Sequence, residues 1–309
     1  MGWFNFNRVG LIGMNGRNAD LIGRYNSRKL FPLVDDKLLT KKLAIDAGIR
    51  VPDLYGVVEI EHQNRRLGEL LAGHNDFVIK PVHGSGGNGI IVISGKMNDQ
   101  YRKHNGVLLS EKVLKHHVSN ILSGLHSLGG RPDKALIESR VEYDPVFENV
   151  TNQGVPDIRL IVFRGVPAMA MVRLPTRESD GRANLHQGAL GVGIDMKTGT
   201  TVSAVAGNEF VDCHPDTGCS VIGLTIPYWP EIMLLAARCY GLAPLDYMGV
   251  DVVLDKHQGP MVLELNARPG LTIQLANQQG LQQQLAQLKK LKTIPSDPQL
   301  RVDLALTAA

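Results

Sequence analysis

A glycine-rich segment with a lysine just before it is the first part of the sequence that could carry out chemistry. It comprises Gly84, Ser85, Gly86, Gly87, Asn88 and Gly89. Lys80 precedes it in an apolar run, and the apolar residues 90–93 follow it. A dinucleotide fingerprint needs a helix after the glycines, and a P-loop ends in Gly-Lys-Ser or Gly-Lys-Thr. Neither condition holds, so we predict a glycine-rich hairpin tip whose backbone N–H groups can cradle phosphates. A plain flexible turn is the alternative.

A second group of polar residues lies in two apolar runs near the end of the chain. Glu264 and Asn266 are two residues apart in one predicted strand, so their side chains point to the same face. Asp251 lies in the preceding strand of a predicted hairpin and can face them. Two carboxylates and an amide oxygen suit Mg²⁺, and Arg268 can bind a phosphate or carboxylate with its planar fork. The alternative is a solvated hairpin face.

The elements that must position these residues mix helices with short strands. Helices are predicted over 35–48, 110–128 and 227–241, and a further helix from residue 280 is expected to give way to an irregular end. Strands are predicted over 77–82, 90–93, 136–141, 158–163, 168–174, 188–195, 247–254 and 261–265. Arg164-Gly165 looks like a hairpin turn. Because hairpins outnumber β-α-β units, we predict an α+β fold with antiparallel sheets.

The composition of the 309-residue chain argues against several classes of protein. A net charge of +3, with scattered Lys and Arg, gives no reason to expect nucleic-acid binding. There is no run of about 18 apolar residues that could span a membrane, and the N-terminus lacks the features of a secretory signal. Three cysteines are too few for a disulfide framework and favour a reduced compartment. We therefore expect a cytoplasmic protein.

Several motifs in the chain, taken in order, resemble those of the ATP-grasp superfamily over residues 35–280. They are Asp36-Lys37 with Thr40-Lys41, Lys80 with the glycine segment, Ile137-Glu138-Ser139-Arg140-Val141, Asp157-Ile158-Arg159, and Glu264-Leu265-Asn266-Ala267-Arg268-Pro269-Gly270. Within the superfamily, Asn184-Leu185-His186-Gln187-Gly188-Ala189 and the segment 191–195 are most similar to the RimK-related α-L-glutamate-ligase-like proteins and to the sugar-transfer-associated group.

The resemblance implies an ATP-grasp fold, in which two α+β subdomains with antiparallel sheets clasp ATP. We expect the lid subdomain at about 77–140 and the core subdomain at about 141–280. Residues 281–309 would form a C-terminal helix and tail. Residues 1–34 form a short segment, so the region before the ATP-binding part is expected to be truncated relative to typical members.

The resemblance also implies a role for each motif. The residues expected to bind ATP are Lys37, Lys80, Gly84, Ser85, Gly86, Gly87, Asn88, Gly89, Glu138, Arg140 and Val141. Asp251, Glu264 and Asn266 would hold Mg²⁺, with two ions favoured and Mn²⁺ as an alternative. Arg159, Arg173 and Arg268 would stabilise the transferring phosphoryl group and the oxyanion. The residues expected to cover the acceptor are Arg177, Arg182, Asn184 and His186, in a polar lid-like stretch.

The implied activity is that of an ATP-dependent carboxylate–amine ligase. A substrate carboxylate would attack the γ-phosphate, and an amine would then capture the acyl-phosphate to form an amide, with glutamate or another amino acid as the group added. A kinase-like enzyme and a non-catalytic ATP-binding subunit are the alternatives. The presence of Lys80, Asp251, Glu264 and Asn266 argues against the second. The apolar C-terminal helix hints at a homo-oligomer.

Overall fold

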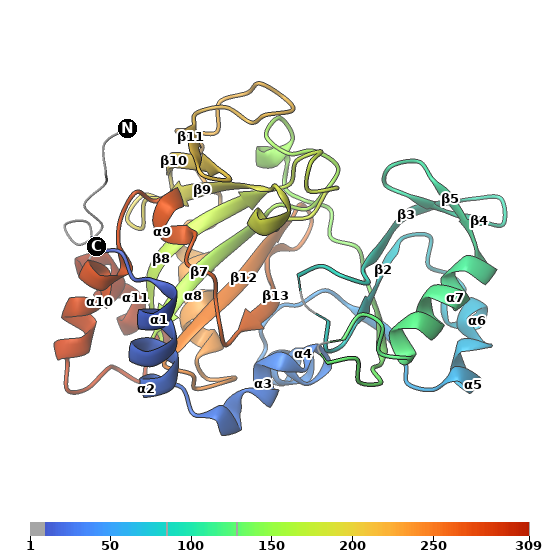
Figure 1. Cartoon of the computed structure of the whole chain (residues 1–309), viewed down its shortest axis with the longest axis horizontal. Helices are drawn as coiled ribbons and strands as arrows, with labels where there is room; N and C mark the ends of the chain where they lie inside the picture. Colours follow the sequence, from blue (N-terminus) through green and yellow to red (C-terminus); the bar gives the residue numbers. More distant parts are fainter. Residues whose placement is uncertain (1–9, 85, 128, 309) are drawn as a thin grey trace. The chain divides into compact units, whose positions relative to one another are not determined.

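The computed structural model describes residues 10–84, 86–127 and 129–308, which form two compact units (Figure 1). The small unit comprises Asp36–Lys41 and Val51–Val141, and the large unit comprises the rest of the chain. Each unit contains one sheet whose neighbouring strands are all antiparallel. The prediction of an α+β fold with antiparallel sheets is therefore confirmed.

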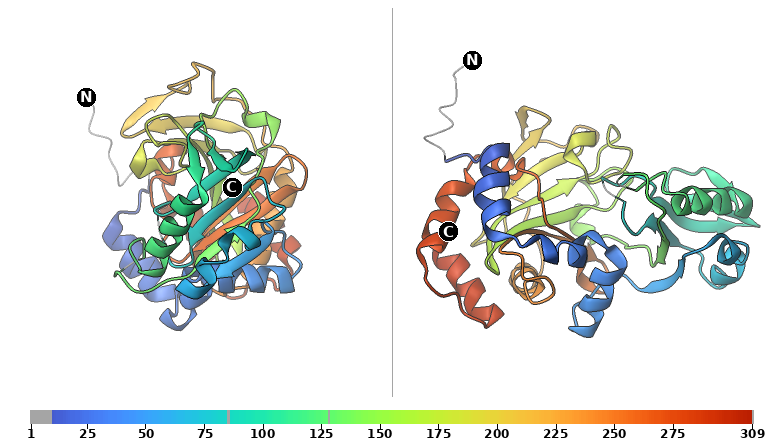
Figure 2. Two further views of the ribbon diagram at one scale, coloured as in Figure 1. Left: turned by 90° about the vertical axis from the view of Figure 1, so that its right-hand side faces the viewer. Right: turned by 60° about the horizontal axis from the view of Figure 1, so that its bottom comes forward.

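The small unit is a six-stranded sheet covered by helices. In spatial order the strands are β1 (Leu54–Val58), β6 (Ala135–Glu138), β2 (Phe77–Pro81), β3 (Ile91–Met97), β4 (Gln100–Lys103) and β5 (Leu108–Ser110). The helices that lie wholly within it are α5 (Glu61–Asn64), α6 (Leu67–Leu70) and α7 (Glu111–Leu122). Figure 2 shows α7 lying across one face of this sheet.

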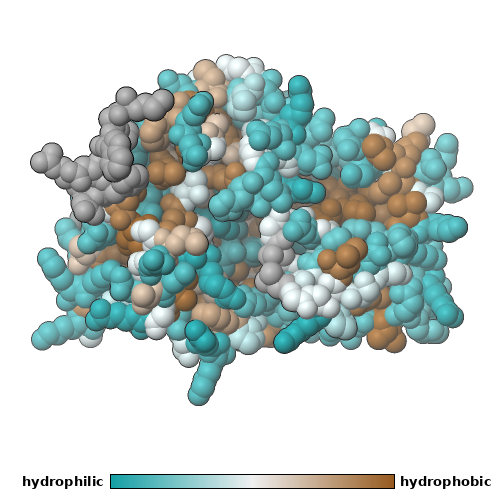
Figure 3. Space-filling model, in the orientation of Figure 1, coloured by the Kyte–Doolittle hydropathy of each residue, from teal (hydrophilic) through white to brown (hydrophobic). Residues whose placement is uncertain are grey.

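Helix α7 covers the sheet because its apolar residues recur at helical spacing. Leu114, Val118 and Ile121 are fully buried and pack in one cluster with Phe77 and Ile79 of β2. The Ser110 side chain caps the helix by accepting a hydrogen bond from the backbone N–H of Val113. This unit also exposes apolar side chains around β3–β5, where Figure 3 shows apolar surface.

The large unit is built on a seven-stranded sheet. In spatial order the strands are β11 (Glu209–Val211), β10 (Thr201–Ala206), β9 (Leu190–Ile194), β8 (Val166–Leu174), β7 (Asp157–Phe163), β12 (Tyr247–Asp255) and β13 (Gly259–Asn266). Its longer helices are α8 (Trp229–Cys239), α10 (Leu281–Lys290) and α11 (Pro298–Ala308), and α4 (Lys37–Asp46) is shared between the two units. Short helical turns complete it: α1 (Met14–Gly16), η1 (Arg17–Ile22), α2 (Gly23–Tyr25), η2 (Arg28–Leu30), α3 (Pro32–Asp35), η3 (Pro145–Phe147), η4 (Leu185–Gln187) and α9 (Ile273–Ala276).

Most predicted elements form, and glycines account for several of their ends. Arg164 and Gly165 both have positive φ, of 52° and 80°, as the predicted two-residue turn between β7 and β8 requires. The helix predicted over 110–128 already ends at Leu122. Gly124 follows with φ 86°, and a Cβ on this glycine would lie 2.3 Å from the carbonyl oxygen of Arg131.

The prediction of an irregular C-terminal end is wrong. The chain forms α11, whose first residue, Pro298, is suited to the first turn of a helix. The Asp297 side chain accepts a hydrogen bond of 2.8 Å from the N–H of Gln299. Val302 and Ala305 are buried, so packing stabilises a helix that the sequence pattern alone did not indicate.

The boundaries of the two units differ from the predicted subdomains. The strand β1 pairs with β6, so the small unit includes residues 51–76 as well as the predicted lid. The segments before residue 35 and after residue 280 belong to the large unit. In the described part of the chain, no helix combines the length and hydrophobicity that crossing a bilayer requires.

The N-terminal segment is attached to the large sheet by the buried side chain of Asn26. Its Nδ2 donates to the carbonyl oxygen of Tyr247 (2.6 Å), and its Oδ1 accepts from the N–H of Tyr247 (2.9 Å). Tyr247 is the first residue of β12, beyond the point where β13 pairs with that strand. The amide side chain therefore takes the place that a neighbouring strand would occupy.

We predict that Asn26→Ala lowers the free energy of unfolding by about 3 kcal/mol, because it removes the buried partner of two backbone groups of Tyr247. Urea denaturation measures this change. The matched control is Asn18→Ala, since the Asn18 side chain is exposed and accepts its hydrogen bonds from the neighbouring Arg17. Equal midpoints for the two variants would contradict the anchoring role of Asn26.

Candidate active site

The glycine segment connects β2 to β3 in the small unit, as predicted. Gly86, Gly87 and Gly89 have φ values of 65°, 79° and 76°, which side chains other than glycine rarely adopt. A Cβ on Gly89 would lie 2.6 Å from the His126 ring, so space as well as conformation requires glycine there. Ser85 lies outside the described residues. These positions of the loop therefore require glycine.

Two buried lysines and one buried glutamate form a charge cluster beside this loop. Lys80 of β2 contacts the Glu138 carboxylate on the adjacent strand β6, and Lys41 Nζ lies 2.9 Å from Glu138 Oε2. The exposed fraction of each of the three side chains is 7% or less. Lys41 also donates to the carbonyl oxygen of Pro52. Buried charges require partners, and here two ammonium groups share one carboxylate.

The pKa values of Lys41 and Glu138 are both shifted by burial and by the charges of their partners in the cluster. Burial lowers the pKa of Lys41, Lys80 lowers it further, and Glu138 opposes both effects. Burial would raise the pKa of Glu138, but Lys80 and Lys41 outweigh it and hold that pKa below its usual value. Glu138 is therefore ionised, and an additional anion such as a phosphate would be favoured near the lysines.

Two residues of the cluster, Glu138 and Lys41, have partners that the sequence did not predict. Glu138 is among the residues expected to bind ATP, and in the structure its carboxylate contacts two lysines. Lys41 belongs to a motif that resembles the superfamily but was assigned no role, although Lys37 and Lys41 are one helical turn apart, a spacing that places both side chains on one face. Lys37 donates a 2.5 Å hydrogen bond to the carbonyl oxygen of Gly84, so it contacts the glycine loop itself.

The other two residues expected at this motif have structural partners. Arg140 pairs with Asp76 through contacts of 3.1 Å. Val141 is buried.

The large unit contains a second buried network, of alternating aspartates and arginines on three adjacent strands. Arg159 of β7 donates through Nε to Asp251 Oδ1 of β12 (2.6 Å), and Arg173 of β8 donates to Asp251 Oδ2 (2.8 Å). Arg173 also forms a two-pronged contact of 2.5 Å with Asp157 of β7. The strand register places Asp157 opposite Arg173 and Asp251 opposite Arg159. Cross-strand pairing thus assembles the network.

The two aspartates of this network differ in their electrostatics. Burial raises the pKa of Asp157 to about 6, against the effect of Arg173, and the nearby Asp251 adds to the increase. Burial acts in the same direction on Asp251, but Arg159 and Arg173 outweigh it and lower its pKa to about 2. Asp251 is therefore firmly ionised and holds both guanidinium groups in place.

The three residues expected to hold Mg²⁺ lie together on the β12–β13 hairpin. Asp251 is directly opposite Glu264 in the register, and Asn266 Nδ2 donates to Asp251 Oδ2 at 3.2 Å. Oxygen donors of this kind fit a hard divalent cation. The Asp251 oxygens also accept hydrogen bonds from Arg159 and Arg173. A cation at Asp251 would therefore compete with these guanidinium groups.

Arg268 makes its contacts away from this network. It pairs with Asp35 at 3.1 Å, and its guanidinium carbon lies 4.8 Å from the centre of the Phe31 ring. Its side chain is about half exposed. Of the three arginines expected to stabilise the reacting groups, the structure thus brings Arg159 and Arg173 together, and it places Arg268 with other partners.

The polar stretch expected to cover the acceptor is an anchored loop. The Thr176 hydroxyl donates to the Gly188 carbonyl (2.8 Å), and the Asp216 carboxylate accepts from the N–H of Arg177 (2.6 Å). Asn184 Oδ1 accepts from the N–H of His186 and caps η4. The side chains of Arg177, Arg182 and His186 are exposed. The loop therefore presents basic groups on a fixed backbone.

We predict that Glu138→Gln lowers the free energy of unfolding by about 3–5 kcal/mol, since it leaves two lysines buried without their carboxylate. Adding Lys41→Met should restore part of the loss, because it removes one of the unpaired charges. Urea denaturation of both variants tests this. Glu231→Gln, which breaks the exposed Arg50–Glu231 pair, should leave the unfolding midpoint unchanged. A Glu138→Gln midpoint equal to that of the control would contradict the counterion role.

Comparison with known proteins gives consistent similarities. Cyanophycin synthetase from Crocosphaera subtropica is 24% identical over 284 residues, which cover 86% of this chain and 31% of that protein. The ribosomal protein bS6–L-glutamate ligase from Escherichia coli is 24% identical over 264 residues, covering 82% of this chain and 63% of that one. A crystal structure of D-alanine–D-alanine ligase from Bacillus anthracis superposes with a TM-score of 0.47 at 14% identity, covering 86% of this chain and 66% of that one.

The chain spans less than two thirds of the length of both of these curated relatives. A family model, described as sugar-transfer associated ATP-grasp, matches residues 16–290 and so includes both the glycine loop and the β12–β13 hairpin. The chain belongs to the sugar-transfer associated ATP-grasp family.

Proposed function

We propose that this chain is an ATP-dependent ligase that joins a carboxylate to an amine through an acyl-phosphate. The observation that carries the proposal is the buried Lys41–Glu138–Lys80 cluster, in which two ammonium groups share one carboxylate and Lys80 lies on β2, the strand that leads into the glycine loop. Such a cluster favours a polyanionic ligand. Family membership makes ATP the ligand of choice.

In this proposal the small unit binds the phosphates of ATP. Lys41 and Lys80 neutralise phosphate charge, and the N–H groups of residues 84–89 donate to phosphate oxygens. Lys37 fixes the first glycine of the loop through its bond to the Gly84 carbonyl. Glu138, which was also expected to bind ATP, acts in this proposal as the counterion to the two lysines.

The large unit supplies the groups that act during phosphoryl transfer. Asp251, Glu264 and Asn266 would hold Mg²⁺, which when bound neutralises phosphate charge. Arg159 and Arg173, which lie beside Asp251, would stabilise charge on the transferring phosphoryl group. The substrate carboxylate then attacks phosphorus, ADP leaves, and an amine displaces phosphate from the acyl carbon.

The acceptor proposed for this site carries a carboxylate. Arg177, Arg182 and His186 project from an anchored loop, and guanidinium groups bind carboxylates in a planar, two-pronged geometry. One of the relatives named above is, in the words of its name, a glutamate ligase. We therefore propose glutamate or another amino acid as one of the two groups joined.

We predict that Lys80→Met lowers turnover at least 100-fold, since it removes one of the two buried lysines that neutralise phosphate charge in this proposal. The assay measures ADP and phosphate release with Mg-ATP and pools of amino acids and short peptides, with mass spectrometry of the products. Lys256→Gln is the matched control, because Lys256 is an exposed lysine paired with Glu142. Its turnover should equal that of the unmodified chain.

The products decide between the classes of enzyme. Amine-dependent ADP release with a new amide, lost in Lys80→Met, supports the ligase. A stable phosphorylated product formed without an amine would replace the ligase with a kinase. Tight ATP binding without turnover on any pool would replace it with an ATP-binding subunit.

A further inference from the structure

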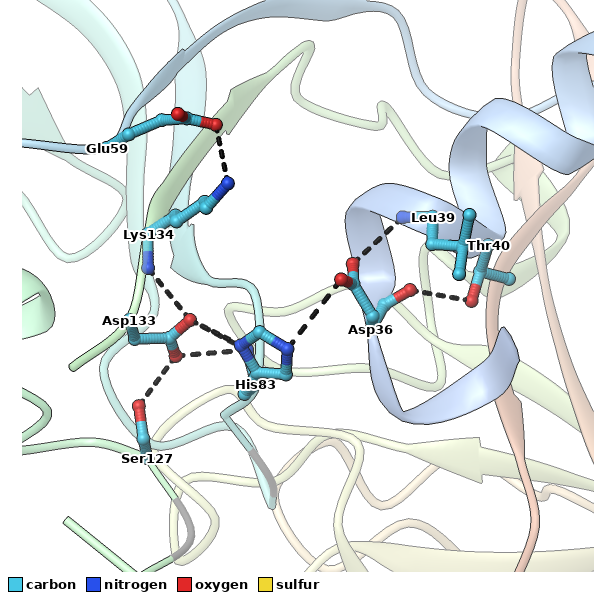
Figure 4. A network of polar contacts seen from close by, with 8 residues as sticks. All are labelled: Asp36, Leu39, Thr40, Glu59, His83, Ser127, Asp133 and Lys134. Carbon is cyan, nitrogen blue, oxygen red and sulfur yellow. Dashed lines mark hydrogen bonds and ion pairs between the residues drawn. The ribbon is translucent and has the colours of Figure 1, made fainter. Parts of the chain in front are cut away.

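A buried carboxylate at the base of the glycine loop has no role in the chemistry described above. The side chain of Asp133 is fully buried, whereas 47% of the His83 side chain is exposed. Figure 4 shows Asp133 at the centre of a group of polar residues that includes His83, Ser127 and Asp36. All of these residues belong to the small unit.

Asp133 continues the ladder between β2 and β6 beyond the point where the backbone pairing stops. Pro81 is opposite Ala135 in the register, and the N–H of Val82 donates to the Lys134 carbonyl (3.0 Å). At the next residue, the N–H of His83 donates to the Asp133 carboxylate oxygens at 3.0 and 3.2 Å. A side chain thus holds the last residue before Gly84.

The same carboxylate fixes the side chain of His83 and the facing loop. His83 Nδ1 lies 2.7 Å from Asp133 Oδ1, and the Ser127 hydroxyl donates to Asp133 Oδ2 (2.6 Å). Burial opposes ionisation of Asp133, but hydrogen bonds from Ser127, His83 and Lys134 outweigh it and lower the pKa of this carboxyl. Gly84 forms a backbone bridge with Ser127. Asp133 therefore contacts both His83, which precedes Gly84 in the chain, and Ser127, which lies opposite Gly84.

The opposite edge of the His83 ring, which carries Nε2, lies near the start of helix α4. His83 Nε2 lies 3.7 Å from Asp36 Oδ2, and Asp36 Oδ1 caps the helix by accepting from the N–H of Leu39 (2.9 Å). Lys37, next in sequence, donates to the Gly84 carbonyl. Gly84, the first glycine of the loop, is therefore held by three neighbours. His83 precedes it in the chain, Ser127 forms a backbone bridge with it, and Lys37 donates to its carbonyl oxygen.

We propose that His83, Asp133 and Ser127 form a positioning cluster that fixes the start of the glycine loop and thereby sets the affinity for the β- and γ-phosphates of the nucleotide. The inference rests on the proposed function, in which this loop covers those phosphates. None of the three residues touches the nucleotide in this proposal. Their effect is to hold the loop N–H groups where a phosphate can accept from them.

Two substitutions of His83 distinguish the contributions of its two ring nitrogens. His83→Asn retains an N–H donor near the position of Nδ1, which faces Asp133, whereas His83→Gln places its donors near the position of Nε2, which faces Asp36. We predict that His83→Gln raises the Kd for the Mg²⁺ complex of a non-hydrolysable ATP analogue about tenfold, the typical effect of one charge-assisted hydrogen bond. His83→Asn should bind within about twofold of the unmodified chain.

AMP is the internal reference, because it lacks the phosphates that the loop would cover. Its Kd should be the same for all variants.

Ser127→Ala, which removes one hydrogen bond from Asp133 and leaves His83 in place, should raise the Kd of the analogue by a smaller factor. Lys134→Gln is the matched control, since it breaks only the exposed Lys134–Glu59 pair at the edge of the same group. Isothermal titration calorimetry gives all these constants, and thermal unfolding reports whether each variant folds.

The outcomes distinguish this inference from the function on which it rests. An unmodified chain that binds neither nucleotide overturns the proposed function and the inference with it. An unmodified chain that binds both, together with a His83→Gln variant that binds the analogue equally well, overturns the inference alone. Weaker binding of both nucleotides by the same factor would show that the cluster only stabilises the fold, and would also overturn it. Selective loss of analogue affinity, restored in His83→Asn, supports it.

Discussion

The packing of helix α4 against the sheet of the small unit depends on the buried carboxylate of Glu138. Glu138 lies between Lys41 and Lys80, and these residues belong to a helix and two strands that are far apart in sequence. Removing three charges from water is costly, and only mutual pairing offsets the cost. The first turn of α4 is thereby held against β2 and β6. That attachment in turn brings Lys37 to the carbonyl of Gly84, so the geometry of the loop depends on the same ion pairs.

The large unit also pairs its buried charged side chains with one another, but in different numbers of positive and negative groups. Two arginines and two aspartates alternate across β7, β8 and β12, so their formal charges balance, whereas the cluster of the small unit has two ammonium groups for one carboxylate. A fully paired network holds its side chains rigidly. In the function proposed above, the phosphates of ATP supply the further negative charge beside the two lysines.

The sequence predicted best what depends on local pattern. The β7–β8 hairpin follows from Arg164-Gly165, and the position of the glycine loop between two strands follows from the apolar runs on both sides. The partners of Glu138 and Asp251 could not be predicted, because each carboxylate is surrounded by residues from separate segments that only the sheets bring together. Lys41 carried a local signal, its spacing from Lys37, which was not used. The burial that stabilises α11 depends on tertiary packing and had no local signal.

Asn26 and Asp133 share one device, in which a side chain takes over a strand's hydrogen bonds at the point where backbone pairing ends. Backbone ladders tolerate almost any residue, because every residue except proline offers the same N–H and C=O. At these two places the hydrogen bonds depend on the identity of one residue. Mutation can therefore adjust the attachment of the N-terminal segment and the base of the glycine loop independently, leaving both sheets intact.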